Sequence, residues 1–274
     1  MSRITSLFNR KRQDILNIYF TAGHPTLDST GTIIRELSQA GVDLIEVGIP
    51  YSDPLADGPT IQASSQQALA NGMTLPILLE QIREVRPDTD VPLVLMGYLN
   101  QVMQYGAERF FRDARTAGVD GLILPDLPLV EFDRTYRELL QKAGLDIAFL
   151  VTPQTPPERI RQLDAASSGF LYLVSSSAIT GGNSAFGDEQ ISYFTRLADM
   201  DLRNPRLIGF GIADHAGYAT ACHYANGAIV GSAFIRALDG GQPLGQVIPA
   251  FVQHIRGPQP ATSSEYSKRS TSAS

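Results

Sequence analysis

The sequence predicts a closed (β/α)8 barrel, the TIM-barrel member of the α/β class, over residues 1–256. A pattern of Ala-Gly-apolar-Asp followed by an apolar run occurs three times, as "QAGVDLIEV" at 39–47, "TAGVDGLIL" at 116–124 and "KAGLDIAFL" at 142–150. Each copy follows a segment with apolar residues at helical spacing, which indicates a helix feeding a strand buried on both faces. Repeated units of this kind, spread over about 250 residues, are typical of a barrel.

The elements can be placed in chain order. At the start, Ile4, Leu7 and Phe8 have the spacing of one helix face, which favours a packed opening helix over an organelle transit peptide. In each repeat the glycine falls where a helix ends in left-handed conformation. Five further apolar runs bring the expected strands to eight: 15–20, 91–96, 169–174, 205–210 and 226–231. An open doubly wound sheet is the alternative, but no dinucleotide-binding glycine motif follows the first strand.

Composition limits the function classes. The 274 residues carry a formal net charge of −6, which argues against a nucleic-acid-binding surface, since phosphate polymers require a basic face. The single cysteine, Cys222, cannot form an internal disulfide, and no apolar stretch is long enough to span a membrane. A cytoplasmic protein is therefore expected. Residues 257–274 have almost no apolar content, so a disordered tail is expected there.

The segment "EVGIPYSDPLADGPTIQ", residues 46–62, places a carboxylate inside an apolar strand and a second one in a proline-rich loop. Glu46 falls near the end of the second expected strand, where barrel enzymes have their active sites. Asp57 lies in the loop that follows, and the prolines limit the conformations of that loop. Two carboxyl groups in different environments can divide acid–base work. The alternative is a structural Glu46 satisfied by neighbouring hydrogen bonds.

Glycines follow the last three expected strands, at Gly181, Gly211 and Gly231. Singly, each could be an ordinary turn residue. Together with Ser232, which begins a short helical run, they predict a phosphate site built from backbone N–H groups and a short helix after the eighth strand.

Aromatic side chains at or near strand ends could enclose a planar apolar group: Tyr19, Tyr98, Tyr172 and Phe210. Each alone could equally be a core or rim residue. The four histidines are dispersed, so no metal site is expected, and Cys222 reads as a small buried hydrophobe. No lysine lies at an expected strand end, which disfavours Schiff-base chemistry.

These motifs resemble those of the tryptophan synthase α subunit family. The similarity runs over residues 15–238 and includes, besides the carboxylate segment, "LMGYLN", "LPDLP", "YLVSSSAITGG" and "GFGI" in the expected order. The resemblance implies a lyase that cleaves indole-3-glycerol phosphate to indole and glyceraldehyde 3-phosphate in tryptophan biosynthesis. It also implies an α2β2 heterotetramer in which pyridoxal phosphate belongs to the β subunit and this chain holds no cofactor.

The resemblance also implies roles for individual residues. Glu46 would protonate the indole C3 and Asp57 would accept a hydrogen bond from the indole N–H. The indole pocket would be formed by Tyr19, Ile123, Leu150, Tyr172 and Phe210. The phosphate site would be formed by Gly181, Gly211, Gly231 and Ser232. Thr180 would lie on a loop that closes over the site. Ser176 stands where some members of the family carry Arg, and Gln101 stands where Pro is frequent. Two alternative functions remain, a phosphate-binding sugar-phosphate isomerase or epimerase and a non-catalytic regulatory partner of the β subunit.

Overall fold

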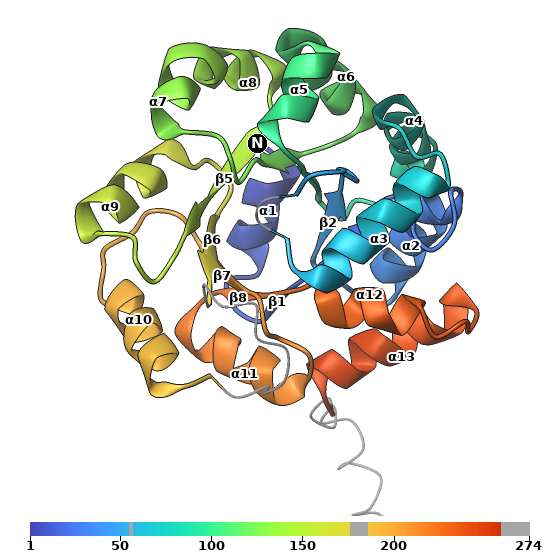
Figure 1. Cartoon of the computed structure of the whole chain (residues 1–274). Coiled ribbons are helices and arrows are strands. Elements are labelled where there is room, and N and C mark those ends of the chain that lie inside the picture. The colour runs from blue at the N-terminus through green and yellow to red at the C-terminus, as the bar shows by residue number, and fades with distance from the viewer. Residues whose placement is uncertain (55–56, 176–185, 259–274) are drawn as a thin grey trace, which may run out of the picture.

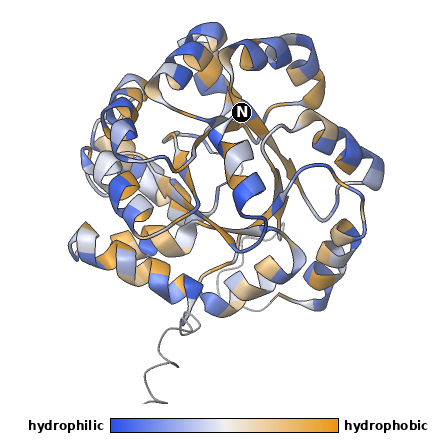
Figure 2. Ribbon diagram, turned by 180° about the vertical axis from the view of Figure 1, so that it is seen from behind, coloured by the Kyte–Doolittle hydropathy of each residue, from blue (hydrophilic) through white to orange (hydrophobic). Residues whose placement is uncertain are grey.

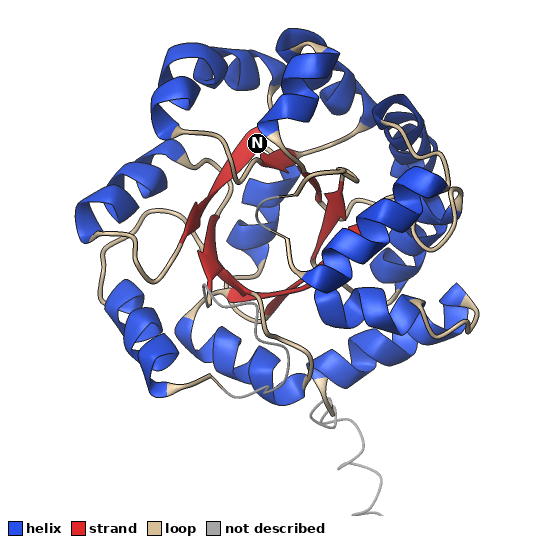
Figure 3. Ribbon diagram, in the orientation of Figure 1, coloured by secondary structure: helices blue, strands red, loops and turns tan. Residues whose placement is uncertain are grey.

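A computed structural model describes residues 1–54, 57–175 and 186–258 of the chain. Within these residues, eight parallel strands form a closed barrel in sequence order, with β1 hydrogen-bonded to both β2 and β8. Figure 3 shows the ring of strands enclosed by helices. The strands are β1 (Ile15–Thr21), β2 (Leu44–Gly48), β3 (Leu93–Met96), β4 (Gly121–Ile123), β5 (Asp146–Val151), β6 (Leu171–Val174), β7 (Arg206–Gly209) and β8 (Gly227–Val230).

Helices surround the barrel on all sides (Figure 1). In chain order the helical elements are α1 (Arg3–Arg10), α2 (Ser29–Gln39), α3 (Pro59–Ala70), α4 (Leu75–Val85), η1 (Arg86–Asp88), α5 (Leu99–Tyr105), α6 (Ala107–Ala117), α7 (Leu129–Glu131), η2 (Phe132–Tyr136), α8 (Arg137–Ala143), α9 (Pro157–Ala166), α10 (Asp188–Ala198), α11 (His215–Tyr224), α12 (Ser232–Leu238) and α13 (Leu244–Arg256). The barrel expected from the sequence is therefore confirmed, including the opening helix and the short helix after the eighth strand.

The repeat glycines adopt the conformation that the sequence predicts for them. Gly41, Gly118 and Gly144 have φ values of 80°, 103° and 71°, and each stands where a helix turns toward a strand. L-residues rarely adopt this region, because their Cβ approaches the backbone carbonyl. The strands that follow are almost wholly buried, as expected for parallel strands covered by helices.

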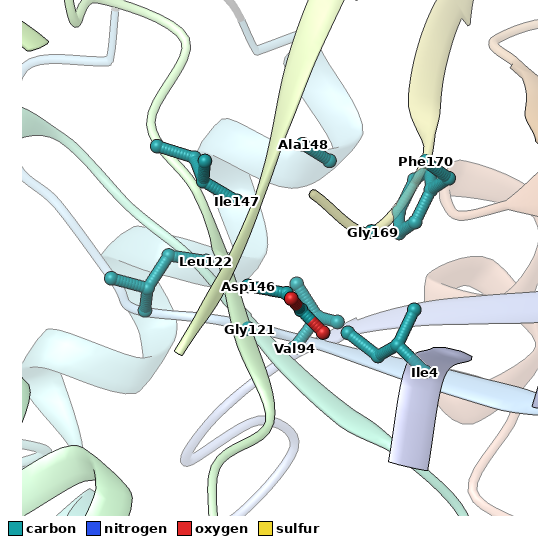
Figure 4. Close-up of a pocket in the computed structure, with 9 residues that line it drawn as sticks. All are labelled: Ile4, Val94, Gly121, Leu122, Asp146, Ile147, Ala148, Gly169 and Phe170. Atoms are coloured by element: carbon teal, nitrogen blue, oxygen red, sulfur yellow. The ribbon is translucent and has the colours of Figure 1, made fainter. Parts of the chain in front are cut away.

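Helix α1 covers the end of the barrel at which the strands begin (Figure 2). Its apolar face is buried through Ile4, Leu7 and Phe8. A small, mostly apolar void lies beneath it, lined by Ile4 together with residues at or near the starts of β3, β4, β5 and β6 (Figure 4). Gly121 leaves room for this helix, since a Cβ there would lie 2.9 Å from Cδ1 of Ile4. This end of the barrel is a packed base, so ligand chemistry belongs at the other end.

Candidate active site

Glu46 is the central residue of β2 and has no solvent-exposed surface. One of its oxygens, Oε2, accepts a hydrogen bond of 3.0 Å from Nδ2 of Asn17 on the neighbouring β1. Burial raises the pKa of Glu46 to about 8, although the Asn17 hydrogen bond acts to lower it. A carboxyl group of this pKa can both give and take a proton near neutral pH.

Asp57 lies just before α3, which begins at Pro59 after the N-cap Gly58. Its side chain is buried, and Oδ2 accepts a hydrogen bond of 3.0 Å from the hydroxyl of Tyr98. Gln62 holds the backbone of this residue by donating from Nε2 to the Asp57 carbonyl, at 2.8 Å. Burial raises the pKa of the Asp57 carboxyl, and the Tyr98 hydroxyl opposes that shift.

The structure brings the two carboxyl groups into one electrostatic neighbourhood. Negative charge on Asp57 raises the pKa of Glu46, after the larger effect of burial and against the Asn17 hydrogen bond. Burial raises the pKa of Tyr172 well above 10, and the charges of Glu46, Asp57 and Tyr19 add to that shift in this order. Tyr19 stands directly opposite Glu46 in the β1–β2 register. Two acids and two phenol rings from β1, β2, β6 and the loop before α3 thus face one another.

The aromatic wall continues toward β7. The rings of Tyr172 and Phe210 lie edge to face, with centroids 6.1 Å apart. Gly209 makes room for the first ring, since a Cβ there would lie 2.4 Å from the Tyr172 hydroxyl. Phe210 itself has a φ of 71°, a strained value for a non-glycine residue, and Ser175 donates a 2.7 Å hydrogen bond to its carbonyl. Strained backbone of this kind is concentrated at functional sites.

The remaining expected pocket residues lie on adjoining strands. Ile123 is the last residue of β4 and is fully buried. Leu150, on β5, pairs with Tyr172 in the register of β5 and β6 and is half-buried. Tyr98 follows β3 and contacts Asp57 through its hydroxyl, so its polar group faces the acid as well.

The glycines expected to hold phosphate are described in part. Gly231 is the N-cap of α12, and Ser232 is the first residue of that helix. A Cβ at Gly231 would lie 3.4 Å from the ring of Tyr19, so this turn adjoins the aromatic wall. Gly211 has a φ of 76° and follows Phe210 directly. Thr180, Gly181 and Ser176 lie outside the described residues.

Sequence reasoning missed two residues of this neighbourhood. Asn17 interrupts the apolar run of β1 just as Glu46 interrupts that of β2, and the same signal could have identified it. Gln101 was noted only as a departure from the family. Its Oε1 accepts from the Tyr98 backbone N–H at 3.0 Å, and its Nε2 donates to the Pro50 carbonyl at 2.9 Å. The side chain therefore links the residue that contacts Asp57 to the loop after β2.

No group of three or more His, Cys, Asp or Glu side chains in the described part of the chain is placed so that it could hold a metal ion. Burial raises the pKa of the Cys222 thiol to about 12, which keeps it protonated and unreactive near neutral pH. None of the helices that the structure describes has both the length and the apolar composition needed to cross a membrane.

The closed barrel of eight parallel strands, with two buried carboxyl groups and aromatic side chains near its strand ends, places the chain in the class of (β/α)8 barrel proteins. Comparison with known families identifies the particular member. Residues 6–250 match the family described as tryptophan synthase alpha chain. The chain belongs to this family.

Individual relatives agree. The chain is 49% identical to the tryptophan synthase alpha chain of Bacteroides thetaiotaomicron over 239 residues, which cover 87% of this chain and 93% of that protein. It is 50% identical to the tryptophan synthase alpha chain of Flavobacterium psychrophilum over 238 residues, which cover 87% of this chain and 94% of that protein. Among solved structures, the tryptophan synthase α subunit of Pyrococcus furiosus superposes with a TM-score of 0.84 at 32% identity, covering 90% of this chain and 100% of that one. A chain of the Mycobacterium tuberculosis tryptophan synthase superposes with a TM-score of 0.81 at 32% sequence identity, covering 93% of this chain and 98% of that one.

Proposed function

We propose that this chain is a carbon–carbon lyase that cleaves indole-3-glycerol phosphate to indole and glyceraldehyde 3-phosphate. The convergence of Glu46 and Asp57 carries the proposal, because the reaction needs one acid with a pKa near neutrality and a second carboxylate beside the ring nitrogen. Family membership supplies the substrate class. Nothing observed favours a sugar-phosphate isomerase or a non-catalytic role.

The proton transfers follow from the positions of the acids. Glu46 gives its proton to C3 of the indole, and Asp57 accepts a hydrogen bond from the ring N–H, where positive charge develops. The bond from C3 to the glycerol chain then breaks, and its electron pair returns to the ring to restore the indole. The adjacent glycerol hydroxyl loses its proton to the Glu46 carboxylate and becomes the aldehyde. Glu46 ends as it began, protonated.

Binding is divided between two walls. Tyr19, Tyr172 and Phe210 enclose the indole, and Ile123, Leu150 and Tyr98 complete that pocket. Gly211, Gly231 and Ser232 present backbone N–H groups to the phosphate. The proximity of Gly231 to the Tyr19 ring supports the close approach of these two walls.

The assembly is proposed from the family. This chain, with residues 1–256 as one catalytic domain, pairs with a β subunit that carries pyridoxal phosphate, in an α2β2 heterotetramer in the cytoplasm. A similar solved structure from Pyrococcus furiosus is described as a tryptophan synthase complex, which supports a multisubunit enzyme. The chain itself needs no cofactor in this proposal, because both proton transfers use the Glu46 carboxyl group.

The first test replaces the acid. Glu46→Gln removes the proton donor and keeps the size of the side chain, so kcat for indole release from indole-3-glycerol phosphate should fall by roughly 10²- to 10⁴-fold. Affinity for indole-propanol phosphate, a stable substrate mimic, should change by no more than a few-fold. Glu158→Gln on exposed α9 is the control and should leave both quantities unchanged. Near-normal kcat in the Glu46 variant would remove this residue from the mechanism.

A further inference from the structure

A buried asparagine lies beside the proposed acid. Asn17 is in the middle of β1, has no exposed surface, and donates from Nδ2 to Oε2 of Glu46 at 3.0 Å. Its backbone pairs with Leu44, two residues before Glu46, so the side chain crosses from one strand to the next. A buried amide costs free energy unless its hydrogen bonds are made, and a valine or isoleucine would suit this strand better. We therefore expect the buried Asn17 side chain to have a functional role.

The contact makes the two oxygens of Glu46 unequal. Oε2 accepts the Asn17 N–H, whereas Oε1 is buried and has no hydrogen-bond partner among the described residues. A carboxylic acid accepts hydrogen bonds mainly at its carbonyl oxygen and carries its proton on the other oxygen. With Oε2 held as an acceptor, the proton of neutral Glu46 resides on Oε1.

We propose that Asn17 is a positioning residue for Glu46, whose amide fixes the carboxyl group and reserves Oε1 as the oxygen that exchanges a proton with the substrate. This inference rests on the proposed function and deepens it. It assigns a role to a residue that never contacts the reacting atoms and acts through Glu46 alone.

The charges around Glu46 agree with this assignment. Burial and the Asp57 charge both raise its pKa, and the Asn17 hydrogen bond is the contribution that lowers it. The other titratable groups that face this carboxyl are the phenols Tyr19 and Tyr172, and burial raises both of their pKa values well above 10. They are neutral at the pH of the reaction. Asn17 thus holds the Glu46 pKa close enough to neutrality for the proton to leave and return.

The direct test is a titration that requires no turnover. Glutamate labelled with 13C at the carboxyl carbon reports each Glu by NMR, and the signal lost in Glu46→Gln identifies Glu46. In Asn17→Leu, which has nearly the same volume and no donor, the Glu46 signal should titrate about one pH unit or more higher than in the unmodified chain. An unshifted titration would overturn the proposal. If Asn17→Leu does not fold, Asn17→Ala takes its place.

Kinetics provide the second readout. Asn17→Leu should lower kcat at neutral pH about tenfold or more, leave KM within a few-fold, and move the limb of the pH–kcat profile assigned to Glu46 to higher pH. The matched control is Asn226→Leu at the base of the barrel. The Asn226 side chain accepts a hydrogen bond from the Arg206 backbone N–H and donates one to the Arg12 backbone carbonyl. This control should change stability and leave the profile in place.

The two possible failures are distinguishable. A uniform loss of kcat/KM with an unchanged profile would show that Asn17 acts only in folding and would overturn its positioning role. Absence of indole release by the unmodified chain would instead reject the lyase function, whatever the NMR titration shows. A shifted profile together with a shifted NMR titration supports the role of Asn17.

Discussion

At the scale of single residues, the raised pKa of Glu46 makes the stability of the fold depend on pH. Its pKa of about 8 in the fold lies above the ordinary value of 4.5, so the folded chain keeps a proton that the unfolded chain has released. The unfolded state therefore gains relative stability as pH rises between these values, at up to about 1.4 kcal/mol per pH unit. Glutamine cannot ionise and escapes this penalty. The proposed acid is thus a residue whose replacement should strengthen the fold.

We therefore expect Glu46→Gln to become progressively more stable than the unmodified chain as pH rises from about 5 to 8. Below pH 4.5 both side chains are neutral and the difference should be small. Urea unfolding at pH 5, 6.5 and 8 measures this difference, with Glu158→Gln as the exposed control. A stability difference that is the same at all three pH values would show that Glu46 ionises normally in the fold.

The sequence could show these residues but not their partners. Glu46 is conspicuous because it interrupts an apolar run, and Asn17 interrupts another in the same way. Their hydrogen bond depends on the β1–β2 register, in which residue 17 faces 44 and residue 19 faces 46, and a local pattern carries no information about register. The left-handed backbone of Phe210 is equally invisible, since that residue type normally avoids it.

At the scale of elements, α1 is expected to stabilise the base of the barrel without affecting the proposed active site. The helix packs Ile4 against the base of the barrel, beside Gly121 and Gly169. Ile4→Ala should therefore lower the free energy of unfolding by about 2–5 kcal/mol, because it enlarges the void there. At a temperature where the variant remains folded, kcat should be unchanged, since Glu46 and Asp57 lie toward the other end. Urea unfolding and indole release test both parts, and a lower kcat in fully folded protein would contradict this separation.

Elements with strong periodicity were predictable and short ones were not. The runs at 39–47 and 142–150 lead into β2 and β5, because helix spacing, glycine and apolar strand occur together there. Expected strand limits were too wide elsewhere, as at 91–96, where β3 is Leu93–Met96. The helices α5 and α7, of seven and three residues, are too short for a 3.6-residue period to be recognised.

At the scale of the whole molecule, the two ends of the barrel are chemically distinct. The buried carboxylate of Asp120, near the base, forms ion pairs with Arg3, Arg86 and Arg115 and accepts the backbone N–H of Leu93. Its single negative charge faces three guanidinium groups, and the contact with Arg3 ties α1 to the strands. The acids at the mouth form no ion pair among the described residues, and burial raises the pKa values of both. The ion pairs of Asp120 therefore lie near the base, and the proposed catalytic acids lie at the mouth.

The difference between the two ends of the barrel predicts where the proposed β subunit binds. The proposed active site opens at the mouth, so the β subunit is expected to cover that end, where α5 and α7 follow the strand ends. Each exposes a large apolar side chain, Met103 at 60% and Val130 at 71%. Val130→Asp introduces a charge into such an apolar contact and should weaken β-subunit affinity by about tenfold or more, while kcat of the chain alone stays unchanged.

Titration of the chain with a tryptophan synthase β subunit, followed by calorimetry, measures that affinity. Asn9→Asp on α1 adds the same charge at the base and should leave binding intact. Equal weakening by both variants would point to a general charge effect, and unchanged binding in Val130→Asp would place the partner elsewhere. Weakening confined to Val130→Asp fits a β subunit seated over the mouth, because only that position lies on the side where the proposed product emerges.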